Sequence, residues 1–193
     1  MKKIPSLYVR DYDGDRLVRD EVVPGSEWVL AGEGQPTIKL DGTCCMVKGG
    51  VLYKRYDAKK GKTPPEGFLP AQEEPDPDEF GGHWPGWVTV GGGPEDRYHR
   101  EALSNCPNGS PFRDGTYELL GPKVQGNAYS LLRYQLSLHG QLVLVDLPEK
   151  LSYESIRDYL KDKTPWIEGI VWHHEDGRMV KVKRKDFGFP WPK

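Results

Sequence analysis

The chain has 193 residues, the usual length of a single domain. Its 23 glycines and 17 prolines indicate many turns and argue against a helical bundle. A net charge of −2 excludes a protein that is basic all over, so contact with nucleic acid would require a local group of cations. The N-terminus lacks the apolar stretch of a signal peptide, and no apolar run approaches the ~20 residues of a membrane span. We therefore expect a soluble, cytoplasmic protein.

The three cysteines, Cys44, Cys45 and Cys106, show no CxxC spacing, which is typical of a reduced cytosolic protein. Cys44 and Cys45 could form a metal cluster with His173 and His174, but this spacing matches no zinc pattern. A simpler interpretation is that small residues alternate along a strand.

Residues 26–56 are predicted to form strands. "EWVLAG" leads into "TIKLDGTCCMVK", and Gly49-Gly50 then turns the chain into "VLYKRY", which is a hairpin signal. Residues 57–110 are rich in proline, glycine and acidic residues, so we expect an insertion there with a short helix near 95–103. Four aromatic residues are expected to hold this insertion in place: Phe68, Phe80, Trp84 and Trp87.

Further strands are predicted at residues 115–121 and 141–147. "SYESIRDYLKD" follows with apolar residues at helical spacing, and Ser152 is a suitable N-cap. "WIEGIVWHH" and "RMVKVKRK" then flank Glu175-Asp176-Gly177, a second hairpin signal. Strands joined by hairpins predict an α+β fold with largely antiparallel sheets and flanking helices.

The last predicted strand carries a row of lysines. In "RMVKVKRK", Val180 and Val182 share one face, while Lys181, Lys183 and Lys185 share the other. The valines are predicted to belong to the core. The lysines either face a ligand or protect an exposed edge strand from aggregation.

Three more charged residues occur in strand-like segments. Alternation in "WIEGIVW" places Glu168 on the face of Ile170 and Trp172, near the lysines. In "TYELLG", Glu118 is either a rim residue or an acceptor for a ligand hydroxyl. Arg55 in "LYKRYD" could hold a phosphate with its planar guanidinium.

Taken in order, these motifs resemble those of the covalent nucleotidyltransferase superfamily, which includes ATP-dependent DNA and RNA ligases and mRNA capping enzymes. The matching pieces are the KxDG motif at 39–42, Arg55, Tyr117-Glu118, "EGIV" at 168–171 and "KVK" at 181–183. Within the superfamily, the chain resembles the compact 5′–3′ RNA ligase family first recognised in vertebrates. The strings "KLDGTCC", "GHWPGWV", "YELLGPKVQGN", "EGIVWHH" and "GFPWP" carry this likeness.

The resemblance covers nearly the whole chain. It implies one adenylyltransferase (nucleotidyltransferase) domain over residues 1–193, which would contain the insertion expected at about 57–110. DNA ligases and capping enzymes of the superfamily usually append an OB-fold domain after the last motif. We expect no OB-fold domain here, a departure that favours a minimal RNA ligase. The resemblance further implies that Lys39 attacks the α-phosphorus of ATP and forms lysyl–AMP. Thr37 and Ile38 would contact adenine, and Arg55 and Glu118 would hold the ribose and the region of the RNA 5′-phosphate.

The same resemblance implies that Lys181 and Lys183 grip the α-phosphate and that Glu168 binds Mg²⁺, with Mn²⁺ as a substitute. AMP would pass to an RNA 5′-phosphate, and an RNA 3′-hydroxyl would displace it. We expect a monomer that binds RNA with 5′-phosphate and 3′-hydroxyl ends. We expect no binding to membranes. A lysine nucleophile must lose its proton, and burial and nearby cations lower the pKa of a lysine.

Some alternatives stay open. The chain could instead be a capping-type or DNA-ligase nucleotidyltransferase, or a non-catalytic module that binds nucleotide or RNA. Tyr134 and His139 are both candidates for stacking on adenine. Trp84 and Trp87 could stack on bases, although large aromatic residues more often anchor a fold.

Overall fold

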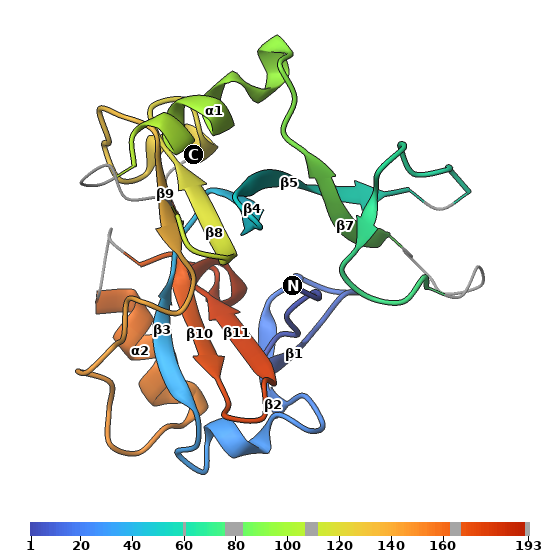
Figure 1. The fold of residues 1–193 in the computed structure, drawn as a ribbon. Coiled ribbons are helices and arrows are strands. Elements are labelled where there is room, and N and C mark those ends of the chain that lie inside the picture. Colours follow the sequence, from blue (N-terminus) through green and yellow to red (C-terminus); the bar gives the residue numbers. More distant parts are fainter. Residues whose placement is uncertain (60, 76–82, 107–111, 163–166, 192–193) are drawn as a thin grey trace. The chain divides into compact units, whose positions relative to one another are not determined.

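A computed structural model describes residues 1–59, 61–75, 83–106, 112–162 and 167–191 (Figure 1). The chain forms two compact units, each with its own hydrophobic core. Unit 1 comprises Met1–Lys3 and Gly42–His139, and unit 2 comprises Ile4–Asp41 and Gly140–Lys193. The chain therefore passes from unit 2 to unit 1 between the aspartate and the glycine of the KxDG motif. The action of both units as one nucleotidyltransferase domain stays a prediction.

Unit 1 contains a six-stranded antiparallel sheet of order β6-β7-β5-β4-β8-β9. Its strands are β4 (Thr43–Lys48), β5 (Val51–Ala58), β6 (Leu69–Pro70), β7 (Trp84–Thr89), β8 (Gly115–Leu120) and β9 (Gln135–Leu138). Lys48 pairs with Val51 across Gly49-Gly50, which confirms the first predicted hairpin. The strand predicted at 115–121 is also confirmed as β8.

The predicted insertion contributes to this sheet through β6 and β7. It also contains the 3₁₀ turn η2 (Pro94–Asp96) and helix α1 (Arg97–Ser104), which confirms the helix expected near 95–103. Trp87 is buried, and the ring of Phe68 meets that of Trp84 edge-on at 5.1 Å. These three aromatic residues do anchor the segment, whereas Phe80 lies outside the described residues. A further 3₁₀ turn, η4 (Gln125–Asn127), lies between β8 and β9.

Unit 2 contains a three-stranded antiparallel sheet of order β11-β10-β3 and a separate hairpin. The sheet consists of β3 (Gln35–Lys39), β10 (Gly169–His173) and β11 (Met179–Lys183), and the hairpin of β1 (Tyr8–Arg10) and β2 (Val18–Val22). Helix α2 (Tyr153–Asp162) lies next to the sheet in Figure 1. His173 pairs with Met179, which confirms the second predicted hairpin. The Ser155 N–H donates to Ser152 Oγ at 3.2 Å, so Ser152 caps α2 as predicted.

One face of this sheet forms the core of unit 2. Ile170 is the direct partner of both Ile38 and Val182, and it packs with Ile156 and Leu160 of α2. Burial of the alternate apolar residues confirms the predicted inward face of β11. The opposite face carries the lysines of β3 and β11.

The strands predicted at residues 27–32 and 141–147 are absent from the structure. Residues 27–29 form the 3₁₀ turn η1 (Glu27–Val29), in which the consecutive residues Trp28 and Val29 are both buried, an arrangement that a strand packed on one side does not allow. Residues 141–147 form no strand, and they meet β3 only through an isolated bridge at Val143 and bonds such as Ile38 N–H to the Leu142 carbonyl. Val145 is 92% exposed there, so its apolar side chain does not mark a buried strand.

The α+β class with antiparallel sheets is confirmed for both units. The helices α1 and α2 span only 8 and 10 residues. In the described part of the chain, no helix has the length and apolar character that crossing a membrane requires.

Candidate active site

The three strands of the unit 2 sheet place three lysines on one face. Gly169 of β10 pairs with Lys39 of β3 on one side and with Lys183 of β11 on the other. Two residues further along, Val171 pairs with Lys181. Because direct partners in antiparallel strands point to the same face, Lys39, Lys181 and Lys183 share one side of the sheet. This confirms that Lys181 and Lys183 face away from the core, as their alternation predicts.

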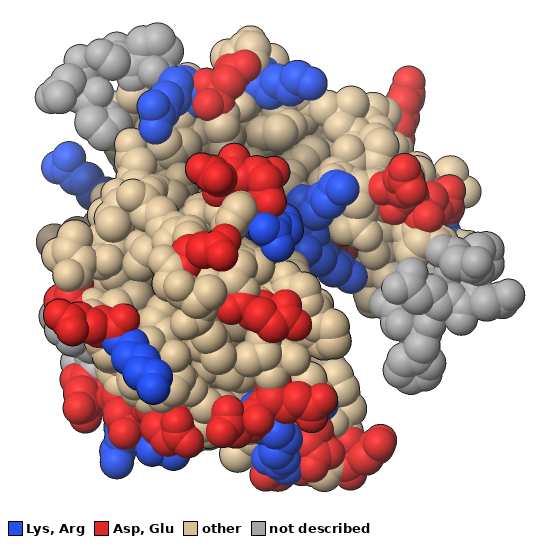
Figure 2. All heavy atoms as spheres, turned by 90° about the horizontal axis from the view of Figure 1, so that it is seen from below, with Lys and Arg blue, Asp and Glu red and all other residues tan. Residues whose placement is uncertain are grey.

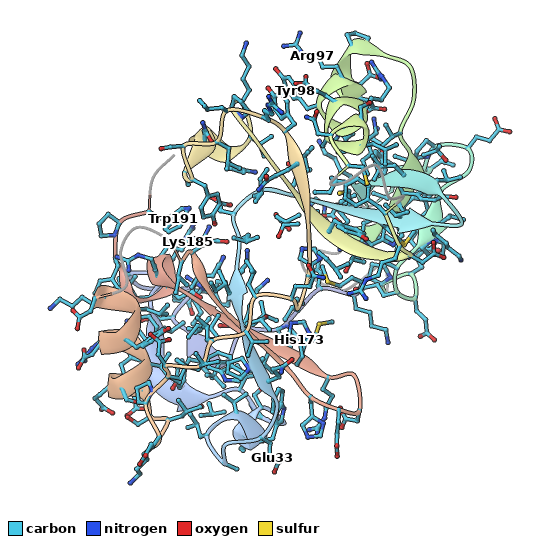
Figure 3. The ribbon with its side chains drawn as sticks, turned by 60° about the vertical axis from the view of Figure 1, so that its left-hand side comes forward. Glu33, Arg97, Tyr98, His173, Lys185 and Trp191 are labelled. Atoms are coloured by element: carbon cyan, nitrogen blue, oxygen red, sulfur yellow. The ribbon has the colours of Figure 1, made fainter. Side chains whose placement is uncertain are left out.

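The lysine expected at position 185 is not part of this row. Lys185 lies beyond β11 in the 3₁₀ turn η5 (Arg184–Phe187), where it is exposed (Figure 3). The strand ends at Lys183, so the alternation that places the other two lysines does not extend to it.

Gly169 lies between Lys39 and Lys183 and has no side chain to separate them. A Cβ atom at this position would lie 2.1 Å from the Val182 carbonyl oxygen. Glycine therefore permits the close approach of β10 and β11 at the level of the two lysines.

Glu168 forms an ion pair with Lys39, and its carboxylate accepts a hydrogen bond from Lys39 Nζ. Glu168 is only 5% exposed. It lies in a bend just before β10, so strand alternation does not govern its direction. The prediction that Glu168 shares a face with Ile170 and Trp172 is therefore wrong, since these two residues belong to the core.

Burial shifts the pKa values of the ionisable groups in this cluster. Burial raises the pKa of Glu168, against the lowering effect of Lys39, and the charge of Asp41 adds to the rise. Burial also lowers the pKa of Lys181, and the nearby charge of Lys39 lowers it further. The pKa of Lys183 falls to about 8, mainly through burial. These cations are poorly solvated, so a bound anion would interact with them strongly.

Thr37 and Ile38 lie on β3 just before Lys39. Thr37 is 1% exposed, and its Oγ1 donates to the Val171 carbonyl at 3.1 Å and lies 3.1 Å from Nε2 of His173 (Figure 3). The Ile38 N–H donates to the Leu142 carbonyl at 2.8 Å. These bonds hold the strand that carries Lys39, and the contact of both residues with adenine stays a prediction.

Trp191 contacts the KxDG motif, a contact that sequence reasoning missed. Its Nε1–H donates to Oδ2 of Asp41 at 2.8 Å, and Figure 3 labels its position. The string "GFPWP" supports the family resemblance, but no spacing rule could connect two residues 150 positions apart. The C-terminal segment thus helps to hold the motif that contains Lys39.

Arg55 belongs to unit 1, where its guanidinium already has several partners. Its Nε lies 3.0 Å from Oδ1 of Asp57, and its Nη1 donates to the Met1 carbonyl at 2.7 Å. The guanidinium also lies over the Trp87 ring, 5.4 Å from the centroid. Joint action of Arg55 with Lys39 stays a prediction.

Glu118 also belongs to unit 1 and is 9% exposed. Its Oε1 accepts from the Gly42 N–H at 2.9 Å, and its Oε2 lies 2.8 Å from Nε2 of His139. A Cβ atom at Gly42 would lie 2.3 Å from the Leu119 carbonyl oxygen, so the glycine of KxDG is required for close packing against β8. Glu118 is thus an ordered acceptor, and its contact with a ribose stays a prediction.

The two candidates for stacking on adenine both have partners within unit 1. Tyr134 is buried, and its ring stacks on that of Tyr98 with centroids 4.5 Å apart (Figure 3 labels Tyr98). His139 bonds to Glu118 and lies 3.0 Å from the hydroxyl of Thr116. The choice between them stays open.

The face drawn in Figure 2 carries charges of both signs, with Lys and Arg side chains in small groups between acidic side chains. The net charge of the chain is −2, so binding of an anion would depend on local groups of cations, such as Lys39, Lys181 and Lys183.

A lysine beside a buried carboxylate, with two more lysines on the same sheet face, is suited to chemistry at a phosphate. Residues 96–193 match the family of RNA ligase 1. RNA ligase 1 of Mus musculus is 30% identical over 271 aligned positions, which cover 99% of this chain and 81% of the mouse protein. RNA ligase 1 of Pongo abelii is 30% identical over 222 positions, which cover 81% of this chain and 68% of that protein. The chain belongs to the RNA ligase 1 family, as its motifs predict.

Proposed function

We propose that this protein is an ATP-dependent RNA ligase that joins RNA 5′-phosphate and 3′-hydroxyl ends. Membership of the RNA ligase 1 family supports RNA as the substrate. One observation carries the reaction type: Lys39 of the KxDG motif lies against buried Glu168, on the sheet face that also presents Lys181 and Lys183. The reaction would proceed through lysyl–AMP and an adenylylated RNA 5′ end, with ATP as a substrate.

In the first step, Lys39 loses its ammonium proton, and the neutral Nζ attacks the α-phosphorus of ATP. A nitrogen–phosphorus bond forms, and the bond from the α-phosphorus to the bridging oxygen breaks. Pyrophosphate leaves, and the second proton of the attacking nitrogen passes to solvent. Lys181 and Lys183 are assigned to the negative oxygens of the α-phosphate, because partly buried cations stabilise the charge of the transition state.

Glu168 is the residue assigned to Mg²⁺, or to Mn²⁺ in its place. The donor set fits such an ion, since carboxylate oxygens are its preferred ligands and the charge of Asp41 also acts on Glu168. A bound ion would neutralise phosphate charge. If Glu168 held such an ion, its carboxylate would no longer pair with Lys39, whose ammonium form this ion pair favours.

In the second step, an oxygen of the RNA 5′-phosphate attacks the phosphorus of lysyl–AMP, and Lys39 leaves with a proton. In the third step, an RNA 3′-hydroxyl attacks the phosphorus of the 5′-phosphate and gives up its proton to solvent. The bond from this phosphorus to the oxygen bridging it to AMP breaks, AMP leaves and a phosphodiester bond remains. Thr37 and Ile38 are assigned to adenine. Arg55 and Glu118 of unit 1 are assigned to the ribose and the 5′-phosphate region.

The test is the intact mass of the protein after incubation with ATP and Mg²⁺. We expect the mass of one added AMP on the natural chain and none on Lys39→Arg. Arginine keeps the positive charge, but its pKa is too high for it to become a neutral nucleophile. Lys48→Arg, at the exposed end of β4, is the control and should retain the adduct.

Lys39→Arg should still join RNA that already carries a 5′-adenylate, because this substrate bypasses the first step. An AMP adduct that persists in Lys39→Arg would contradict the role of Lys39. Absence of any adduct on the natural chain, with ATP and Mg²⁺ or Mn²⁺, would contradict the proposed reaction.

A further inference from the structure

We propose that Cys44, Glu118 and His139 of unit 1 form a binding site for a thiophilic divalent cation such as Zn²⁺. The site shares no residue with the lysine cluster of unit 2 or with the metal site assigned to Glu168. It does use Glu118, which is also assigned to the ribose, so cation and nucleotide would compete for this carboxylate. Its three residues supply a thiol, a carboxylate and an imidazole, which are the side-chain ligands that Zn²⁺ uses in proteins.

The donor atoms are already close together. One atom from each of Cys44, Glu118 and His139 lies within 4.8 Å of the other two. Around a tetrahedral zinc ion with bonds of about 2.0–2.3 Å, neighbouring donor atoms lie about 3.3–3.8 Å apart. Small side-chain rotations are therefore enough to close the site, and solvent would supply the fourth ligand. In the described part of the chain, no other group of three such residues has its donor atoms this close.

Two neighbouring strands of one sheet hold two of the ligands, and the third directly follows another strand of that sheet. Cys44 of β4 is the direct cross-strand partner of Glu118 of β8, so their side chains lie on the same face. His139 follows β9, and its N–H donates to the Thr116 carbonyl of β8 at 3.0 Å. Ligands carried by paired strands keep their spacing better than ligands on loops.

Contacts behind the ligands also suit a metal site. Nδ1 of His139 lies 3.0 Å from the Thr116 hydroxyl, which orients the ring and directs Nε2 toward Glu118. The Gly42 N–H holds the other carboxylate oxygen at 2.9 Å. Such outer contacts fix the direction and tautomer of metal ligands. A cation would take the place of the close contact between Nε2 of His139 and Oε2 of Glu118, which are 2.8 Å apart.

The donor set selects the class of cation. A thiolate and an imidazole suit Zn²⁺ and Co²⁺, whereas Mg²⁺ prefers oxygen ligands alone. Cys44 is only partly buried, so an ion can reach it from solvent. The adjacent Cys45 is fully buried in the core of unit 1 and is not part of the site.

The experiment is an anaerobic Co²⁺ titration of the untagged full chain, followed by absorption. Cobalt bound to a thiolate gives a sulfur-to-metal charge-transfer band in the near ultraviolet. We expect this band in the natural chain and in Cys106→Ser, and its displacement by Zn²⁺. Cys44→Ser should abolish the band, and His139→Gln should weaken cobalt binding at least ~10-fold. Because binding requires the thiolate, affinity should fall as the pH is lowered.

Absence of the band in the natural chain, or its persistence in Cys44→Ser, would overturn the site. Circular dichroism of each variant shows whether it is folded, and Cys44→Ala offers a second substitution if the serine variant is not. The titration contains neither ATP nor RNA, and Lys39→Arg should keep the full band. Failure of the metal site and failure of the ligase reaction are therefore separate outcomes.

Discussion

Lys39 is paired with an acid that favours its ammonium form, although the proposed reaction needs the neutral amine. Glu168 is the partner, and burial raises its pKa. Lys181 acts in the opposite direction, because two ammonium groups close to each other are unfavourable. The ion pair with Glu168 and the nearby charge of Lys181 thus act on Lys39 in opposite directions. Glu168 is also the residue proposed to hold Mg²⁺, which would supply positive charge beside the phosphates of ATP.

Lys183 should reduce the stability of the fold at neutral pH. Its pKa falls from 10.5 in the unfolded chain to about 8 in the folded protein, mainly through burial. Below pH 8 the lysine is charged in both states, so the folded state carries the full burial penalty. Between pH 8 and 10.5 the folded lysine is neutral while the unfolded one is still charged, so the free energy of unfolding rises with pH.

We therefore predict that Lys183→Met is more stable than the natural chain at pH 7. After allowance for solvent screening, the gain in free energy of unfolding should be about 1–2 kcal/mol. This gain should shrink as the pH approaches 10, as measured by urea unfolding at several pH values. Lys48→Met, at an exposed position, should show no such dependence. A gain for Lys183→Met that grows with pH would contradict the burial of this charge.

The first residue of β10, Gly169, should tolerate no side chain. In Gly169→Ala, the new Cβ would lie 2.1 Å from the Val182 carbonyl oxygen, so β10 and β11 must separate. We expect a loss of about 1–3 kcal/mol in the free energy of unfolding, together with slower adenylylation because Lys39 and Lys183 flank this residue. Gly92→Ala, where nothing lies within 4 Å of the added atom, is the control. Equal stability of the two variants would show that the strands can shift freely.

The C-terminal segment should support the reaction through Trp191. Trp191→Phe keeps an aromatic ring but removes the N–H that bonds to Asp41. A hydrogen bond to a charged group contributes about 1.5–3 kcal/mol, so single-turnover adenylylation should fall at least several-fold. Trp84→Phe removes a comparable bond to the Gln72 carbonyl in unit 1 and should leave adenylylation unchanged. The assignment fails if the Trp191 variant forms the adduct at the natural rate.

The proposed function draws on both compact units of the molecule. Lys39, Glu168 and the lysines of β11 belong to unit 2, whereas Arg55 and Glu118 belong to unit 1. The chain crosses between the units directly after Asp41. A ligase built in this way would need both units for the complete reaction.

RNA ligases and DNA ligases share the same sequence motifs, so the nucleic acid that the enzyme joins is what distinguishes them. The ribose 2′-hydroxyl is the group by which a protein distinguishes RNA from DNA. We predict that the preformed enzyme–AMP joins RNA ends at least ~10-fold faster than all-DNA ends of the same sequence, which corresponds to about 1.4 kcal/mol. Quenched time courses on matched substrates measure this ratio. Equal rates would instead support a DNA ligase, and transfer of the nucleotide to a diphosphate end would support a capping enzyme.

Local patterns in the sequence were enough to predict several parts of the fold. Gly49-Gly50 and Glu175-Asp176-Gly177 each mark a hairpin, and the spacing from Ser152 onward marks α2. Alternation in β11 correctly separates core valines from the lysines. These features depend on residues that are neighbours in the chain, so their physical cause is visible in a short window. The ordered motifs were likewise sufficient to identify the RNA ligase family.

Contacts between distant residues were decided only by the tertiary structure. The direction of Glu168 depends on a bend before β10, and residues 141–147 fail to form a strand although their composition favours one. Trp191 reaches Asp41, and Cys44 meets Glu118 and His139, across separations that no periodicity encodes. Strand pairing and burial determine which of these groups meet. The sequence by itself determined the family and the candidate nucleophile, Lys39. The packing of the strands decided which charged groups, such as Glu168 and Lys181, lie near Lys39.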